Sequence, residues 1–202
     1  MARPRSDISE RIVHAARARF LEDGVDGASL RRIAKDAHTN VGMIYYYFPT
    51  KDDLFLAVVE EVYPRILDDL SRALGDDVPV AARIERMYAR LAALSDDELT
   101  VIRTIVREAL VSSSRRERLL ERFARGHLPI VLRAMADGIA AGDLTDRHGP
   151  AVLGIAAVAL GIGPQLARRM LPEKSPLDAL VPRGEALARA LADVFLHGAA
   201  KA

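Results

Sequence analysis

Apolar residues recur at spacings of three and four along most of the chain, which is the pattern of amphipathic helices. The segment 51–73 shows it most clearly, with apolar side chains at Leu54, Val58, Val62, Ile66 and Leu70. No segment alternates as a half-buried strand does, so we expect an all-α protein. The pattern predicts about nine helices, at 8–22, 30–37, 41–48, 51–73, 80–94, 96–111, 115–140, 150–170 and 183–198.

Two of the predicted helices are short, adjacent and capped. Ser29 stands where the N-cap of helix 30–37 belongs, and Asn40 stands at the same place before helix 41–48. Only the turn 38–40 separates them. Two short capped helices joined by a tight turn indicate a helix-turn-helix, in which the second helix enters the major groove of DNA with its N-terminal residues first.

Other local signals set the ends of the neighbouring helices. Gly24 is a natural left-handed stop for the first helix. Thr50 with Asp53 has the form of a capping box that opens the fourth helix. Pro64 is expected to kink or split that helix, because proline removes a backbone hydrogen bond.

Three consecutive tyrosines occupy the second short helix. Successive helical residues turn by about 100°, so Tyr45, Tyr46 and Tyr47 sweep about 200° of its surface. If Ile44 and Phe48 face the core, at least one of the tyrosines must be exposed. A tyrosine hydroxyl can donate to a phosphate while its ring packs on a sugar, which suits a wet, polar partner. A single tyrosine is more often only half-buried and amphipathic, but three in a row favour binding.

Lys51 stands in the first turn of a predicted helix, where the macrodipole disfavours a cation by a few tenths of a kcal/mol. Asp52 and Asp53 offset that cost. An anion docked at the helix end would explain the lysine, because the ammonium and the backbone N–H groups would hold one phosphate together. A solvated lysine tolerated by its acidic neighbours is the alternative.

Composition limits the remaining classes of function. The 202 residues include no cysteine, which excludes disulfides and thiolate chemistry, and the five histidines show no metal-ligand spacing. No cofactor is therefore expected. Residues 1–51 carry nine basic and six acidic side chains, a net charge of +3 against −2 for the remainder, which is compatible with nucleic-acid contact.

We expect a cytoplasmic protein that does not bind membranes. The N-terminal segment has no apolar signal core. The longest uncharged run, 150–167, contains Pro164 and Gln165, and its strictly apolar part is shorter than the roughly 20 residues of a membrane helix.

Residues 11–54 resemble the DNA-binding domain of the TetR family of bacterial transcriptional repressors. The matching positions are Ala16, Phe20, Gly24, Ser29, Leu30, Ile33, Ala34, Gly42, Ile44, Tyr45, Phe48, Lys51 and Leu54. The turn departs from the family pattern, which usually has glycine at His38 and an apolar residue at Thr39. Histidine tolerates left-handed geometry, so the turn can survive.

The resemblance implies two domains: a three-helix helix-turn-helix DNA-binding domain at 1–50, and a larger helical regulatory, effector-binding and dimerisation domain at 51–202. It implies DNA contacts at Arg31, Thr39, Asn40, Val41, Gly42, Met43, Tyr45, Tyr46 and Lys51. Arg3 and Arg5, by charge alone, form a basic arm for the DNA backbone or minor groove.

The resemblance also implies a homodimer and a small-molecule effector that is largely apolar. Small and apolar residues of the last two helices predict the dimer interface, at Gly154, Ala157, Gly161, Leu187, Leu191, Val194 and Phe195. A buried helix within one subunit would explain the small residues equally well without the family. The expected effector-pocket residues are Met87, Tyr88, Leu91, Ile102, Ile105, Phe123, His127, Val131 and Met135.

The favoured function is a transcriptional repressor that binds a near-palindromic double-stranded DNA operator as a dimer and is released by its effector. The alternative is an all-helical enzyme or small-molecule carrier whose N-terminal bundle only packs. We find no nucleophile–base pair to support an enzyme. A third possibility is a regulator that binds DNA constitutively or responds to another protein.

Overall fold

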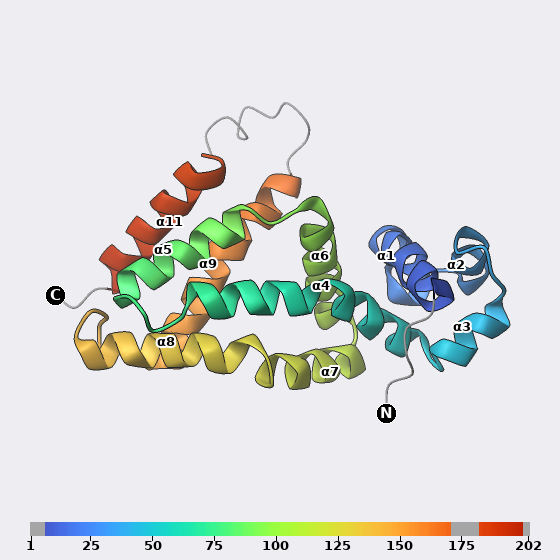
Figure 1. The fold of residues 1–202 in the computed structure, drawn as a ribbon, viewed down its shortest axis with the longest axis horizontal. Helices are drawn as coiled ribbons and strands as arrows, with labels where there is room; N and C mark the ends of the chain where they lie inside the picture. The colour runs from blue at the N-terminus through green and yellow to red at the C-terminus, as the bar shows by residue number, and fades with distance from the viewer. Residues whose placement is uncertain (1–6, 171–181, 200–202) are drawn as a thin grey trace. The chain divides into compact units, whose positions relative to one another are not determined.

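The computed structural model describes residues 7–170 and 182–199, and these residues form ten helices and no strand (Figure 1). The all-α prediction is therefore confirmed. The helices are α1 (Asp7–Gly27), α2 (Leu30–Asp36), α3 (Val41–Tyr47), α4 (Lys51–Ala73), α5 (Val80–Ala92), α6 (Asp96–Val111), α7 (Ser113–Ala124), α8 (His127–Ala141), α9 (Pro150–Met170) and α11 (Gly184–Ala199). Arg3 and Arg5 of the expected basic arm lie outside the described residues.

The chain divides into two compact units. Unit 1 comprises Met1–Pro64 and Asp96–Glu121, and unit 2 comprises Arg65–Ser95 and Arg122–Ala202. This grouping differs from the expected boundary at residue 50. The reason is that α6 packs against α1, which joins part of the predicted regulatory domain to the DNA-binding helices.

The core of unit 1 includes the apolar face of its first helix. Ile12, Ala16 and Phe20 of α1 are fully buried, and Phe20 meets Phe55 of α4 edge-on with ring centroids 6.5 Å apart. Helices α2 and α3 each contact α1 and each other (Figure 1). This packing fixes the two short helices on a common support.

Two helix boundaries differ from the prediction. Helix α1 resumes after Gly24 and ends only at Gly27, although Gly24 has the expected positive φ of 72°. The predicted helix 115–140 is two helices, α7 and α8, because the backbone of Gly126 leaves the helical region with φ −116° and ψ −114°. Helix α4, by contrast, runs through Pro64 without being split.

Helix α5 organises unit 2, where it packs against α8, α9 and α11. Its Tyr88 is fully buried and meets Phe195 of α11 edge-on, with ring centroids 6.3 Å apart. The buried face of α5 therefore links the C-terminal helix to the rest of the unit.

The small residues of α9 serve this packing inside the subunit. A Cβ atom added at Gly154 would meet Val131 Cγ1 of α8 at 3.0 Å, and one added at Gly161 would collide with Leu91 of α5. Ala157 is fully buried between them. Gly154, Ala157 and Gly161 therefore make close helix contacts within one chain, and their place in a dimer interface stays a prediction.

The remaining predicted interface residues, all on α11, differ in their exposure. Leu187 and Phe195 of α11 are buried, Leu191 is half-buried, and Val194 is 59% exposed. Only Val194 of these presents a large apolar side chain to the outside.

One described helix, α9, is long and apolar enough over Pro150–Arg168 to cross a membrane, judged by length and composition alone. This differs from the expectation that the apolar run is too short. Core helices of globular proteins pass the same criterion, and α9 packs against α5, α8 and α11.

Candidate DNA-binding surface

The local signals of the helix-turn-helix form as predicted. Ser29 Oγ accepts a hydrogen bond from the backbone N–H of Arg32 over 3.4 Å, and Asn40 Oδ1 accepts one from the backbone N–H of Met43 over 3.0 Å. His38 adopts the left-handed conformation, with φ 51°. These caps and this turn set the angle at which α3 leaves α2.

Helix α3 has one buried face and one aromatic exposed face. Ile44 is 1% exposed and joins the core, whereas Tyr45 and Tyr46 are 54% and 53% exposed. Tyr47 is half-buried, and its ring meets that of Tyr46 edge-on at 5.1 Å. The expected exposure of tyrosine rings is therefore observed, and their contact with DNA stays a prediction.

The N-terminal end of α3 is accessible. Asn40 and Gly42 are exposed, and Val41 and Met43 are half-buried. An added Cβ at Gly42 would meet only Asn40 Oδ1, at 3.1 Å, so the backbone there is open to close approach.

Two other predicted DNA contacts lie outside α3 in unit 1. Arg31 of α2 is exposed, and Thr39 of the turn is half-buried. The arrangement allows α3 to enter a groove with its first turn leading, while Arg31 reaches out from the supporting helix.

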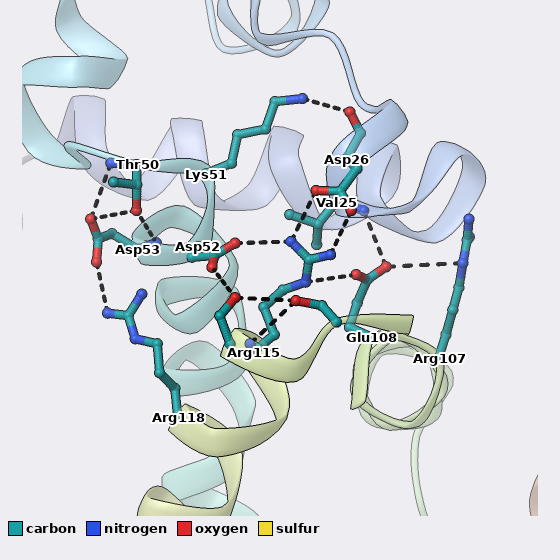
Figure 2. Close-up of polar contacts among 12 residues, drawn as sticks. Val25, Asp26, Thr50, Lys51, Asp52, Asp53, Arg107, Glu108, Arg115 and Arg118 are labelled. Carbon is teal, nitrogen blue, oxygen red and sulfur yellow. Dashed lines mark hydrogen bonds and ion pairs between the residues drawn. The ribbon is translucent and has the colours of Figure 1, made fainter. Parts of the chain in front are cut away.

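Lys51 lies at the start of α4, beside the end of α1. Its ammonium donates to the backbone carbonyl of Asp26 over 2.8 Å (Figure 2). An ammonium has three donors, so this bond leaves capacity for a phosphate. Thr50 and Asp53 close the predicted capping box: Asp53 Oδ2 accepts from the Thr50 amide at 3.0 Å, and Thr50 Oγ1 accepts from the Asp53 amide at 3.1 Å.

An ion cluster centred on the buried Arg115 lies close to Lys51 and was not predicted from the sequence. We call it the Arg115 cluster and define it as Asp26, Asp52, Glu108 and Arg115. Arg115 of α7 is only 4% exposed. It donates to both carboxylate oxygens of Asp26, over 3.0 and 2.7 Å, and to Asp52 Oδ1 over 2.9 Å. Its Nε lies 2.9 Å from Glu108 Oε2 of α6.

Charge pairing in the cluster shifts the pKa values of Asp26 and Arg115. The hydrogen bond from Arg115 holds the pKa of Asp26 below its ordinary value, and the reverse interaction raises the pKa of Arg115. Glu108 also accepts from the Val25 amide over 3.1 Å. No local motif could have revealed this cluster, because its members come from four helices and lie up to 89 positions apart.

The expected effector residues are distributed over both units. In unit 2, Met87, Tyr88, Leu91, Val131 and Met135 are buried on α5 and α8. His127 and Phe123 are half-buried there, with ring centroids 4.8 Å apart. In unit 1, Ile102 is buried and Ile105 is half-buried.

Tyr88 brings a polar hydroxyl group among the buried apolar side chains of α5. Its hydroxyl is buried and has no hydrogen-bond partner among the described residues. Burial also raises the pKa of Tyr88 well above its ordinary value, so the hydroxyl stays a donor. An unpaired buried hydroxyl costs on the order of 1–3 kcal/mol, which a ligand acceptor would recover.

Comparison with known proteins links the N-terminal region to one family. Residues 12–58 match the sequence model described as bacterial regulatory proteins, tetR family. The nicotine-responsive transcriptional repressor HdnoR of Paenarthrobacter nicotinovorans is 28% identical over 97 residues, which are 48% of this chain and 50% of that protein. The chain spans about half the length of the curated relatives it matches first.

Solved structures share the fold over nearly the whole chain. A tetR-family regulatory protein from Rhodococcus superposes with a TM-score of 0.78 at 20% identity, covering 98% of this chain and all of that one. FadR of Bacillus subtilis, solved with stearoyl-CoA, gives a TM-score of 0.73 at 17% identity, covering 94% and 98%. At these identities the likeness establishes the fold alone.

Proposed function

We propose that this chain, whose residues 12–58 carry the DNA-binding domain of the TetR family and whose fold is that of TetR-family regulators, is a ligand-responsive transcriptional repressor. It binds a near-palindromic DNA operator as a homodimer. A small-molecule effector releases it from the operator through coupled equilibria.

The exposed face of α3 carries this proposal. Tyr45 and Tyr46 present more than half of their surface to solvent although both are large aromatic residues, and Ile44 anchors the opposite face of the helix. Exposed aromatic side chains of this kind mark a binding surface. Also in unit 1, the open backbone at Gly42 suits groove entry, and the partly exposed Lys51 suits a phosphate contact.

A salt titration tests DNA binding directly. The full chain would be titrated against sheared genomic DNA at rising salt concentration, with Tyr46→Ala and Lys51→Gln as variants. We expect the logarithm of affinity to fall linearly with the logarithm of salt. Lys51→Gln should make that slope shallower by about 0.9, the value of one neutralised phosphate. An affinity that changes neither with salt nor with the two substitutions would contradict the proposal.

The dimer interface that we propose uses the outward faces of α9 and α11. Val152 and Ile155 of α9 are 55% and 70% exposed, and Val194 of α11 is 59% exposed. The two helices pack against each other in unit 2, so their apolar residues can form one surface. A second copy of the chain would bury it and would explain the apolar character of α9.

The effector that we propose is largely apolar and carries one hydrogen-bond acceptor for Tyr88. The buried side chains around Tyr88 on α5, Met87 and Leu91, are apolar, and its hydroxyl is the unpaired donor. Stearoyl-CoA, with which FadR of Bacillus subtilis was solved, is a suitable first probe.

Thermal unfolding with and without stearoyl-CoA, for the unaltered chain and for Tyr88→Phe, tests the effector. A ligand that binds the folded state raises the melting temperature, and we expect a smaller rise for Tyr88→Phe. An equal rise in both proteins would remove Tyr88 from the site.

A further inference from the structure

We infer that Arg115 is a positioning residue for the phosphate contact of Lys51, an inference that rests on the proposed DNA binding. Arg115 does not touch Lys51. It holds the two residues that determine where the Lys51 ammonium lies, namely Asp26 and Asp52, and all four residues belong to unit 1.

On one side, Arg115 fixes the acceptor of Lys51. The Lys51 ammonium is bound by the backbone carbonyl of Asp26, in the last turn of α1. The side chain of the same Asp26 receives two parallel hydrogen bonds from Arg115, a fork geometry that restricts both distance and orientation. The Asp26 side chain is otherwise 80% exposed, so the Arg115 fork is its main tether.

On the other side, Arg115 fixes the residue that follows Lys51. Asp52 lies in the first turn of α4 and accepts from Arg115 over 2.9 Å and from Ser114 Oγ over 3.1 Å. Figure 2 shows the Arg115 guanidinium between Asp26 and Asp52, with Lys51 across from it. One guanidinium therefore holds the end of α1 and the start of α4 together at the base of Lys51.

Arg115 also neutralises the carboxylates beside Lys51. Unpaired, the carboxylates of Asp26 and Asp52 would compete with the phosphate for the Lys51 ammonium. Glu108, 1% exposed, anchors the guanidinium from behind through Nε. Because the pairs are largely buried on the Arg115 side, salt screens them less than it screens exposed ion pairs.

The test compares Arg115→Gln, Lys51→Gln and the double variant on the duplex that the unaltered protein selects from a random library. If Arg115 acts through Lys51, each single variant should bind about tenfold more weakly than the unaltered protein, which is the effect of losing one charge-assisted hydrogen bond. The double variant should bind only slightly more weakly than either single variant. Both single variants should also show the same reduction of the salt slope, about 0.9 for one phosphate. The inference would be overturned if the loss of affinity in the double variant equalled the product of the two single losses. It would also be overturned if Arg115→Gln kept the salt slope of the unaltered protein.

Arg118→Gln is the matched control, because Arg118 also joins α7 to the first turn of α4 but donates to Asp53. It should keep the affinity and slope of the unaltered protein. Should Arg115→Gln fail to fold, Arg115→Lys takes its place, because lysine keeps the charge opposite Glu108 but has no fork to hold Asp26 and Asp52 at once.

Hydrogen exchange of the protein without DNA separates this inference from the proposed function. Arg115→Gln should speed exchange of the backbone amides at 51–54 relative to Arg118→Gln. Unchanged exchange would overturn the positioning role whatever the protein binds, whereas absence of any salt-dependent DNA binding by the unaltered chain would overturn the proposed function instead.

Discussion

At the scale of single residues, Gly161 and Gly27 lie in opposite surroundings. A methyl group at Gly161 would collide with Leu91 and would come within 3.2 Å of the rigid Tyr88 ring. A methyl group at Gly27 would meet only Asp23 Cβ, at an ordinary 3.6 Å. The first site is closed by packing and the second is open.

We expect Gly161→Ala to destabilise the protein by about 1–3 kcal/mol, because overpacking shifts the buried neighbours. Gly27→Ala, the control, should be neutral or stabilising by up to about 1 kcal/mol, since alanine is the better helix residue. Urea unfolding measures both. If Gly161→Ala were as stable as Gly27→Ala, α9 would not pack closely on α5.

His127 gives a pH prediction at the same scale. Burial, together with the charge of Arg122, lowers the pKa of His127 in the folded protein. The unfolded chain then binds the proton more readily, so the free energy of unfolding should fall as pH drops below the ordinary histidine value of about 6.5. Urea midpoints at pH 7.5 and 5.5 should differ less in His127→Gln. An equal difference in the variant would show that other groups cause the pH dependence.

At the scale of the elements, Asn40 has two separable roles. It caps α3 through Oδ1, and it is an expected DNA contact. Aspartate caps a helix as well as asparagine does, but it brings a negative charge to the groove. Asn40→Asp should therefore keep the stability of the protein and weaken DNA binding.

Asn40→Ala should lower the stability by about 1 kcal/mol through removal of the cap. Thermal unfolding and DNA titration of both variants measure the two roles independently. Asn40→Asp with unchanged DNA affinity would place Asn40 away from the DNA.

Local chemistry explains which elements were predictable. The caps at Ser29 and Asn40 and the left-handed His38 depend on neighbours within a few positions, so the sequence pattern locates them. The break at Gly126 was missed because apolar spacing continues across it, and a glycine inside a helical pattern is tolerated at modest cost.

Long-range contacts could not be predicted, because their residues lie far apart in the sequence. Arg115 meets Asp26 across 89 positions, and neither residue belongs to a motif. The small residues of α9 indicated close helix contact correctly, but nothing in their spacing distinguishes a partner within the chain from one in a second copy.

At the scale of the whole molecule, the homodimer that we propose is formed through exposed apolar residues of α9 and α11. We expect Ile155→Glu to convert the dimer to a monomer, because a charge would be buried without a partner. Leu110→Glu is the control, since Leu110 of α6 is 78% exposed and lies outside the proposed interface. Light scattering after size exclusion gives the masses of both variants. A dimer in both would show that the interface does not include Ile155.

Selection from a random duplex library tests the central claim, that the exposed face of α3 binds DNA in a specific sequence, most directly. We expect the full chain to enrich duplexes with two inverted half-sites whose centres lie about one helical turn, or a multiple of it, apart. Tyr46→Ala should weaken binding to the enriched duplex. A library that stays random after repeated rounds, or an enriched duplex bound equally well by Tyr46→Ala, would contradict the claim.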